Sequence, residues 1–501
     1  MGPTQREGWS KRNKVSTSRC SRKSDDCIVP KKLSNSSGGK AVTQYQSWKG
    51  KHILYTEIGD NVETKLERIA EIARNRPEEV FTALIHHINK DMLVDCHYEL
   101  DADKAAGVDG VTKKEYEKNL VENIENLLDR MKSKSYRPKP VKRVYIEKLS
   151  GGKRPLGIPA YEDKLVQRAT AKILNAIYEE DFLDFSFGFR PERSGHDALR
   201  MVNDICNRDK IKYVLDTDIK GFFDNVDHEW LMKFLGHRIN DPNMLRLIAR
   251  FLKSGIMEDG QKQRTEKGTP QGGVCSPVLA NIYLHYVVDI WFDRKISKQL
   301  RGESYMVRYA DDIIFCFEHE YDAQRFREEL TERLEKFELE LSEEKTSLVK
   351  LEDDEEDSDS GKYSRTFDFL GFTNYMGKCR DGIKRHKVKT SSERFNRSVR
   401  RCKEWIKANR TLPVEDFMKE LNRKLVGTYN YFGVSGNSKS VNTLHYRVRK
   451  LVYKWLNRRS QRKSFNWDKF QKFLNKFKLK RPRIKVDIFK SGTGLCCLSK
   501  G

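Results

Sequence analysis

Two adjacent acidic residues, Asp311 and Asp312, lie at the centre of an apolar stretch that runs from Tyr305 to Phe317. The residues on either side are rich in Val, Ile, Tyr and Phe, which predicts two short β-strands joined by a bend at the acidic pair. Burying unpaired carboxylates is costly in free energy. A divalent cation would remove that cost, because hard cations bind carboxylate oxygens. The segment therefore predicts a metal-binding hairpin, and the alternative is a solvated Asp-Asp turn.

A third acid is expected to join this pair. Asp218 lies at the end of a predicted strand over residues 213–219 and begins the motif DIKGFFD, which closes at Asp224. A glycine-rich loop over residues 268–277 precedes a predicted helix. Phosphoryl transfer depends on positioning and charge neutralisation more than on covalent chemistry. The three segments together therefore favour a nucleotidyl transferase site.

Such a site would use two metal ions about 4 Å apart to activate a 3′-hydroxyl and stabilise the leaving pyrophosphate. Asp218 and Asp311 would then be the bridging ligands, with Asp312 beside them. Asp216 and Asp224 are nearby acids, and we expect each to take a surface or supporting position.

The elements that must position these motifs follow from the apolar spacing. Helical spacing runs from about Glu63 to about Tyr98, residues 107–110 predict a turn, and residues 367–372 predict a short strand. From about Lys378 the chain is expected to be helical, with its aromatic side chains used mainly for packing. Two amphipathic helices are predicted earlier in the chain by apolar residues on one face, namely Leu165, Ala169, Ile173 and Ile177 in the first and Phe326, Leu330, Leu334 and Phe337 in the second.

The composition favours a polyanionic partner. The 501 residues carry a net charge of +24 and the pI is about 9.4. Lys and Arg neutralise phosphates and release their counterions. No apolar run approaches the roughly 20 residues of a membrane span, so no membrane partner is expected. The ten cysteines show no paired zinc-type spacing, which fits a reducing compartment.

Taken together, the motifs resemble the reverse transcriptases that group II introns encode, which are retroelement proteins. Any one motif is weakly specific, whereas the ordered set is specific. Residues 425–432 (LVGTYNYF) look like the thumb and maturase region of the same family. The matching motifs occur in the order of the family, and they are 107–110 (GVDG), 152–159 (GKRPLGIP), 187–194 (FGFRPERS), 218–224 (DIKGFFD), 268–277 (GTPQGGVCSP), 309–312 (YADD), 341–346 (LSEEKT) and 369–372 (FLGF).

The resemblance implies an α+β fold. It is a right-hand polymerase, in which fingers and a palm with an antiparallel sheet are followed by an all-helical thumb and maturase domain. The family gives no role for the polar N-terminal arm or for the solvated acidic insert. The expected domain boundaries are 1–60 for the basic arm, 61–377 for fingers and palm with the insert at 352–361, 378–490 for the helical domain, and 491–501 for the tail.

The resemblance also implies roles for individual residues. Asp218, Asp311 and Asp312 match the catalytic acids that bind the metal ions, which are Mg2+ with Mn2+ as the alternative. Phe223 matches an aromatic steric gate whose ring would clash with a ribose 2′-hydroxyl, and the alternative is a core aromatic. Lys345 matches a lysine proposed as a proton donor to pyrophosphate, and the alternative is a solvated lysine.

Three further residues match contacts of the family to the incoming nucleotide. Gln271 matches a position that touches the nucleotide. Lys148 and Arg154 match fingers residues on its triphosphate, where Arg offers bidentate contacts and Lys a point charge.

The basic helices after about residue 378 are the candidates for binding structured RNA. We expect Arg458, Arg459 and Lys463 to take part. The expected partners are an RNA template and primer, deoxynucleotides, a DNA target and the cognate intron RNA, whose splicing and mobility the protein would assist. The family often carries an endonuclease with His and paired Cys, and because this sequence shows no such cluster, we expect a member without it.

Two other functions stay open at this point. One is a domesticated relative that serves phage defence, CRISPR spacer acquisition or DNA repair. The other is a non-catalytic RNA-binding splicing factor, against which the three intact acids argue. The bacterial cytoplasm is the expected location, with an organelle as the alternative. The nucleotide sequence around the gene would separate the first two functions, because only an intron protein lies within a catalytic RNA.

Overall fold

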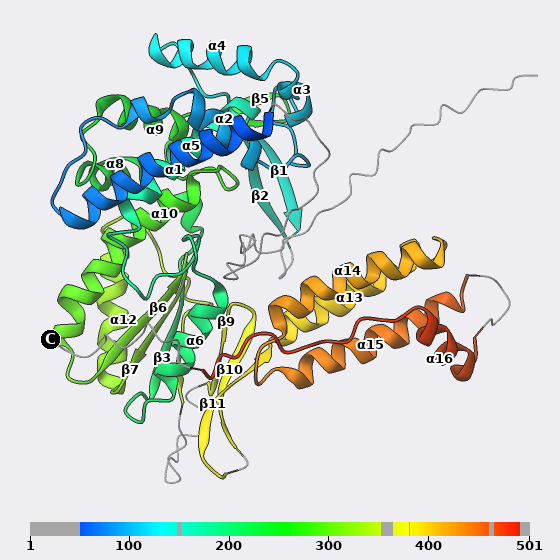
Figure 1. The fold of residues 1–501 in the computed structure, drawn as a ribbon. Coiled ribbons are helices and arrows are strands. Elements are labelled where there is room, and N and C mark those ends of the chain that lie inside the picture. The colour runs from blue at the N-terminus through cyan, green and yellow to red at the C-terminus, as the bar shows by residue number, and fades with distance from the viewer. Residues whose placement is uncertain are drawn as a thin grey trace, which may run out of the picture. The chain divides into compact units, whose positions relative to one another are not determined.

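The computed structural model describes residues 51–147, 152–263, 265–351, 364–379, 381–459 and 465–490. Most of the expected basic arm, the acidic insert at 352–361 and the tail at 491–501 lie outside these residues. The described strands form three sheets, with helices packed against them (Figure 1). Within the described residues, no helix combines the length and the apolar character needed to cross a membrane.

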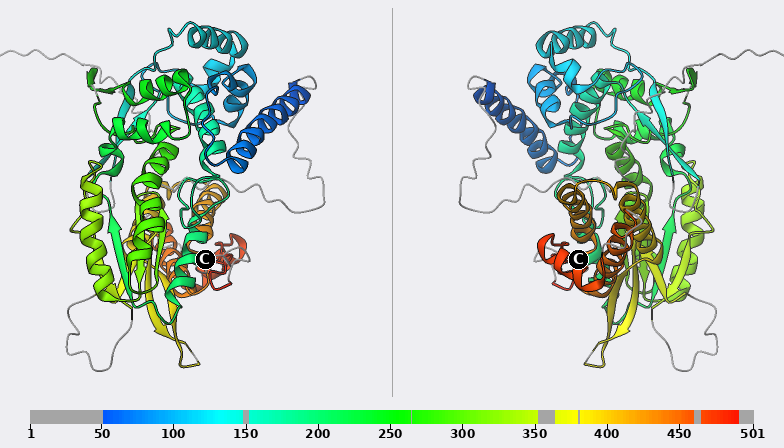
Figure 2. Two further views of the ribbon diagram at one scale, coloured as in Figure 1. Left: turned by 90° about the vertical axis from the view of Figure 1, so that its left-hand side faces the viewer. Right: turned by 90° about the vertical axis from the view of Figure 1, so that its right-hand side faces the viewer.

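The first helices build a layer around α5 (Tyr161–Tyr178). The long helix α1 (Lys51–Asn75), blue in Figure 2, packs on α5 and on α2 (Lys90–Glu99). It begins earlier than the helical spacing at Glu63 had predicted, so the last part of the expected arm is helical. The apolar face predicted for α5 is confirmed, because all four of its residues are fully buried. The remaining elements of this layer are a 3-10 turn (Ile85–His87), α3 (Lys113–Glu117) and α4 (Leu120–Lys132).

The first sheet has the strand order β2-β1-β4-β5. Strand β1 (Val141–Glu147) pairs antiparallel with the edge strand β2 (Lys153–Ile158) and runs parallel to β4 (Ile256–Glu258) on its other side. The short β5 (Gln261–Gln263) closes the edge. This sheet corresponds to the fingers expected from the resemblance.

The second sheet has the order β6-β7-β3-β8, and every pair in it is antiparallel. It consists of β6 (Ser304–Tyr309), β7 (Asp312–Phe317), β3 (Tyr213–Asp218) and β8 (Ser347–Lys350). Helix α12 (Glu320–Glu335) packs on β3 and β7, and α6 (Gly195–Cys206) packs on β6. The apolar residues predicted for α12 are buried, including Phe337 just after its end. The antiparallel palm is therefore confirmed.

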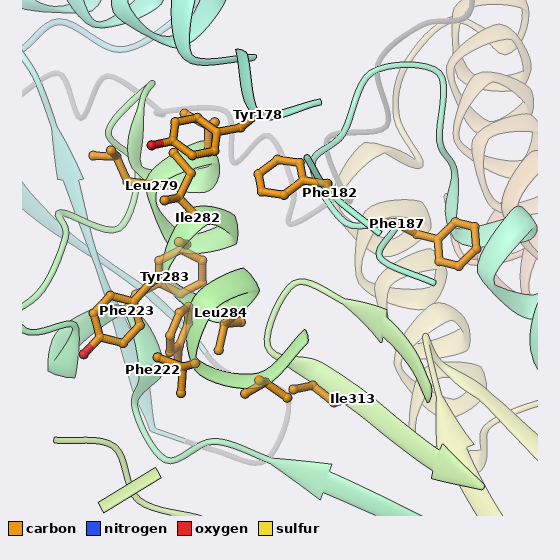
Figure 3. Packing of buried hydrophobic residues seen from close by; sticks show 14 of the residues in the cluster. Tyr178, Phe182, Phe187, Phe222, Phe223, Leu279, Ile282, Tyr283, Leu284 and Ile313 are labelled. Carbon is orange, nitrogen blue, oxygen red and sulfur yellow. The ribbon is translucent and has the colours of Figure 1, made fainter. Parts of the chain in front are cut away.

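Helices between the strands of the palm complete its core. Aromatic and aliphatic side chains from α5, α7 and α10 meet the end of β7 in one cluster (Figure 3). Two π-helical turns make the helix after α10 irregular, and the first of them contains Asp289, which belongs to the site described below. These elements are α7 (Phe222–Asn225), α8 (His228–Gly236), α9 (Pro242–Leu252), α10 (Ser276–Leu284), the π-helical turns His285–Asp289 and Phe292–Ile296, and α11 (Ser297–Gln299).

The third sheet corrects two expectations. Its order is β11-β10-β9, built from β9 (Thr366–Phe369), β10 (Phe372–Lys378) and β11 (Lys384–Thr390). The single strand predicted over 367–372 is a hairpin, because the chain turns at Leu370 and Gly371, whose φ values are 52° and 79°. The chain is also not helical directly after Lys378. In β11, His386 and Val388 are buried while their basic neighbours are not, and this alternation is a strand signal.

The C-terminal region is helical from Ser392 and has a hydrophobic core of its own. Its helices are α13 (Ser392–Asn409), α14 (Val414–Phe432), α15 (Ser438–Leu456) and α16 (Trp467–Lys476). Helix α13 packs against α14 and α15 (Figure 1). Buried residues such as Phe417, Leu425 and Phe470 form the core, which confirms a packing role for Phe470, one of the aromatics assigned to packing from the sequence.

Candidate active site

The acidic pair lies where the sequence predicted it, at the bend between two strands. Strands β6 and β7 pair in antiparallel register with Tyr309 opposite Asp312, and Ala310 and Asp311 form the turn between them. Ala310 has a φ of 60°, a left-handed conformation that a residue with a Cβ seldom adopts. Surrounding structure must hold such a turn in place.

Strand register brings the third acid to the same place. Asp218, the last residue of β3, pairs directly with Asp312, the first residue of β7. Side chains of directly opposed residues project from the same face of an antiparallel pair. Asp216 lies two residues before Asp218, so it projects from the same face. The carboxyl groups of three strand residues therefore gather at one end of the palm sheet, next to Asp311.

The acids repel one another in a poorly solvated place. Burial raises the pKa of Asp311, and the charge of Asp218 raises it further, while Arg154 and Lys345 act in the opposite direction. Burial, and then the charges of Asp216 and Asp311, hold the pKa of Asp312 well above its usual range. Burial and its acidic neighbours raise the pKa of Asp216 to about 7. A bound cation would favour the ionised form of every member of this group.

The chemistry of these donors fits a hard divalent cation, which takes carboxylate oxygens. No group of three or more His, Cys, Asp or Glu side chains in the described ranges lies close enough together to hold a metal ion. The Lys345 ammonium nitrogen lies 2.8 Å from Asp218 Oδ2, so one carboxylate already has a cationic partner. Both of these side chains are partly exposed, which leaves them room to turn. The donors are thus assembled at one end of the sheet, while their convergence on an ion is not preformed.

The expected nucleotide contacts meet at a junction between fingers and palm. Arg154 Nε donates to Gln271 Oε1 at 2.9 Å, and Gln271 Nε2 donates to Asp224 Oδ2 at 3.4 Å. The backbone N–H of Gly157 also donates to the carbonyl oxygen of Gln271 at 2.5 Å. Strand β2 and the glycine-rich loop therefore form one unit, and they line a cavity of about 160 Å³. Lys148 lies outside the described residues.

Phe223 is mostly a core residue. Its exposed fraction is 8%, its ring packs against Phe222, and its carbonyl oxygen accepts a hydrogen bond from Thr269 N at 2.7 Å (Figure 3). That hydrogen bond joins α7 to the glycine-rich loop. The steric gate stays a prediction, and it requires the small exposed edge of the ring to face the sugar.

A buried ion pair behind the catalytic turn was missed by the sequence reasoning. Arg308 and Asp289 are both fully buried, with Nε to Oδ1 at 2.7 Å and Nη2 to Oδ2 at 2.5 Å. Burial alone would raise the pKa of Asp289, but the charge of Arg308 and hydrogen bonds hold it below the usual value. Arg308 Nη1 also donates to Asn281 Oδ1 at 2.9 Å and to the carbonyl oxygen of Ala310 at 3.2 Å. The guanidinium therefore supports the left-handed residue of the turn directly.

The motif at residues 187–194 holds the same turn from another side. The backbone of Arg308 exchanges hydrogen bonds with Phe185 and Phe187, both at 2.8 Å. Asn281 Nδ2 donates to the carbonyl oxygen of Gly188 at 2.7 Å. A Cβ on Gly188 would lie 2.3 Å from the backbone nitrogen of Ala310, so only glycine fits there. A charged residue inside an apolar strand was the sequence signal that could have pointed to Arg308.

The two predicted RNA-binding residues that the structure describes lie in different environments, and their role in RNA binding stays a prediction. Arg458 is exposed, and its guanidinium lies 5.4 Å from the ring centre of Trp455. Arg459 is half-buried and donates to the carbonyl oxygen of Leu412 at 2.9 Å, which gives it a role in packing. Lys463 lies outside the described residues.

Comparison with known proteins agrees with this geometry. Residues 138–374 match the family described as reverse transcriptase (RNA-dependent DNA polymerase), and this range includes Asp218, Asp311 and Asp312. The palm thus belongs to a reverse transcriptase domain. Residues 395–473 match the family described as the group II intron, maturase-specific domain. The chain carries these two domains in sequence and is homologous to group II intron-encoded proteins.

Three relatives illustrate the similarity. The group II intron-encoded protein LtrA of Lactococcus lactis subsp. cremoris is 39% identical over 246 residues, which cover 48% of this chain and 41% of LtrA. Protein YkfC of Escherichia coli (strain K12) is 40% identical over 200 residues, 39% of this chain and 52% of YkfC. An uncharacterized 91 kDa protein in the cob intron of Schizosaccharomyces pombe is 33% identical over 245 residues, 48% of this chain and 30% of that protein. The chain spans about half or less of the length of these curated relatives.

Proposed function

We propose that the protein is an RNA-directed DNA polymerase that copies RNA into cDNA by two-metal nucleotidyl transfer. The observation that carries this proposal is the pairing of β3 with β7, which sets Asp218 opposite Asp312 and beside the turn that contains Asp311. This arrangement lies inside a domain that matches reverse transcriptases. A site of three carboxylates at a sheet end is suited to neutralising the charge that develops during phosphoryl transfer, once cations occupy it.

Mg2+, with Mn2+ as the alternative, would activate the 3′-hydroxyl of the primer and offset charge on the pyrophosphate when bound. Asp218 and Asp311 would hold the ions, with Asp312 beside them. Lys345, which touches Asp218, would turn toward the pyrophosphate and donate a proton to it. On the fingers side, Arg154 and Gln271 would orient the deoxynucleotide triphosphate, and Phe223 would limit the space at its sugar.

The test is primer extension on an RNA template with the purified full chain. Asp311→Asn should abolish extension and leave RNA affinity nearly unchanged, because only metal ligation is lost. Asp209→Asn is the matched control, since Asp209 is exposed and lies outside the site, and it should extend at the wild-type rate. Normal extension by Asp311→Asn would overturn the assignment.

We also infer that the protein binds the folded RNA of a group II intron and assists its splicing and mobility. The match of residues 395–473 to the maturase-specific domain and the net charge of +24 support this partner. An RNA template, a primer, deoxynucleotides and a DNA target complete the proposed set of partners. The similarity to a bacterial intron-encoded protein supports the bacterial cytoplasm as the location, and an organelle is the alternative.

A further inference from the structure

A strongly basic groove lies within the C-terminal helical region, away from the residues predicted to bind RNA. Helices α14, α15 and α16 and the segment over residues 478–485 line it, and its volume is about 740 Å³. In Figure 1 this segment is the red trace that runs back along the orange helices. The lining contains no Asp or Glu, and its cations are Arg449, Lys478, Lys480, Arg481, Arg483 and Lys485.

The segment that supplies most of these cations is held in place by its backbone. Asn422 accepts a hydrogen bond from Lys480 N at 2.8 Å and donates one to the carbonyl oxygen of Lys478 at 2.9 Å. Leu479 between them is buried. Further along, Lys485 N donates to the carbonyl oxygen of Gly433 at 2.8 Å. Hydrogen bonds thus hold the backbone of the segment, while its basic side chains are exposed along the groove.

Among the described residues, none of these six cations forms an ion pair with Asp or Glu. The positive charge of two of these cations acts inside the groove, on His445. Burial lowers the pKa of His445, and the charges of Arg481 and Arg449 lower it further. A concentration of positive charge without counter-charges is costly, and a polyanion would relieve it.

The groove also carries side chains that can form hydrogen bonds with the bases of a nucleic acid. Its wall carries the amide side chains of Asn430, Gln471 and Asn475. Arg449 Nη2 donates to Gln471 Oε1 at 2.5 Å, while Arg449 Nε is buried without a hydrogen-bond partner. Amides provide both donors and acceptors, which suits the edges of bases that are not paired.

We propose that this groove binds a single-stranded segment of RNA, with phosphates on the basic segment 478–485 and an unpaired base against the amide wall. The proposal rests on the inferred RNA partner and specifies where and in which form that RNA is held. A volume of this size belongs to the range of small-ligand sites, so the groove itself accommodates one or two nucleotides, while the phosphates of their neighbours would follow the exposed cations of the segment 478–485. Sequence-specific RNA recognition targets such unstacked nucleotides in loops and bulges.

The test compares two triple variants of the full chain. The groove variant is Lys480→Gln/Arg481→Gln/Arg483→Gln. The control removes as many charges from exposed positions outside the groove, through Arg400→Gln/Lys403→Gln/Lys419→Gln. Affinity for a fluorescein-labelled single-stranded RNA of 12 nucleotides is measured by anisotropy at several salt concentrations, and circular dichroism checks that both variants fold.

Counterion release sets the expected size of the effect. Each phosphate contact contributes about 0.7 to the slope of log affinity against log salt for a single strand. Losing three contacts should therefore reduce the slope by about 2 and weaken binding roughly 100-fold near 0.1 M salt. The control variant should change the slope by less than half as much. Asn475→Ala should alter the preference among RNA sequences and leave the salt slope unchanged.

Equal losses in the groove and control variants would overturn the proposal, as would a groove variant with wild-type affinity. The groove variant should also lose less affinity for a blunt RNA duplex or for single-stranded DNA of the same sequence than for the single-stranded RNA. If the loss were equal for these nucleic acids, the groove would be a general surface for polyanions and the proposal would be overturned. Primer extension at saturating template distinguishes failure of this proposal from failure of the proposed polymerase function. The groove variant should retain extension, whereas failure of extension by the wild type would reject the polymerase and leave the binding comparison valid.

Discussion

The buried ion pair behind the acidic turn yields the sharpest prediction. Replacing Arg308 with Met leaves Asp289 as a carboxylate that is fully buried and without its cation. Breaking a buried pair in this way costs about 3–5 kcal/mol of folding free energy. We therefore expect Arg308→Met to lower the free energy of unfolding by that amount in urea denaturation followed by circular dichroism.

A double variant separates stability from function. Arg308→Met/Asp289→Leu removes both charges, and apolar replacement of a buried pair is often nearly neutral. The remaining cost comes from Asn281 and the carbonyl oxygen of Ala310, which lose hydrogen bonds from Arg308, at about 1–3 kcal/mol for an unsatisfied buried group. The double variant should therefore be measurably more stable than the single one.

Its activity should stay low. Ala310 is held in a left-handed conformation, and without Arg308 its carbonyl oxygen is free to move with the turn. Displacing a reacting group by about 1 Å can cost roughly 10²-fold in rate. Primer extension should show that loss in kcat at saturating nucleotide, together with a higher Mg2+ concentration for half-maximal rate. A merely destabilising change would not alter the metal requirement of the folded fraction.

The control is Arg74→Gln, which breaks an ion pair whose arginine is 65% exposed. Exposed pairs contribute little to stability, so stability and extension should both match the wild type. If the double variant regains its stability and extends at the wild-type rate with the wild-type Mg2+ requirement, the support of the turn by Arg308 is refuted.

Four further outcomes are expected. Phe223→Ala should open space for a 2′-hydroxyl and raise ribonucleotide incorporation, on the order of 10²-fold, and an unchanged deoxy-to-ribo preference in extension assays would reject the steric gate. The raised pKa of Asp216, about 7, means that the folded state binds this proton more tightly than the unfolded state, so stability falls as the pH rises from about 4 to 7. Asp216→Asn should thus raise the thermal midpoint most at pH 8 and least at pH 4, and a pH-independent difference would contradict this sign. Arg459→Gln should lower stability through loss of its contact with a backbone carbonyl, whereas Arg458→Gln should weaken RNA binding and leave stability unchanged, and the reverse pattern would reassign the two residues. Asp311→Asn should still promote splicing of the cognate intron at low Mg2+, because stabilising a folded RNA requires only preferential binding. Deletion of the helices from Ser392 onward should abolish splicing. If the wild-type protein does not enhance splicing, a domesticated reverse transcriptase is favoured.

Local patterns in the sequence were sufficient for much of the fold and for the position of the acids. The period of apolar residues marked α5 and α12, and the apolar flanks of Asp311 and Asp312 marked a hairpin. These features succeeded because the side-chain periods of helices and strands are properties of the local backbone. The same principle was present and overlooked in β11, where alternation at His386 and Val388 indicated a strand in a region expected to be helical.

The tertiary structure decided which groups meet. Asp218 and Asp312 are brought together by strand register, and Arg154 reaches Gln271 across the junction of fingers and palm. The ion pair of Arg308 with Asp289 joins β6 to the π-helical turn at residues 285–289. Such contacts join segments far apart in the chain, and their energies depend on packing and desolvation at the meeting point, which neither segment encodes alone.

The same reason separates the basic residues of the C-terminal region into different roles. Lys and Arg are dense throughout that region of the sequence, and composition alone predicted only that it binds a polyanion. Arg459 packs inward and donates a hydrogen bond to a backbone carbonyl. The hydrogen bonds of Asn422 hold the basic segment 478–485 along a groove. The sequence thus determined the charge and the local elements, and the tertiary structure decided which charges are neutralised by packing and which are left to face a ligand.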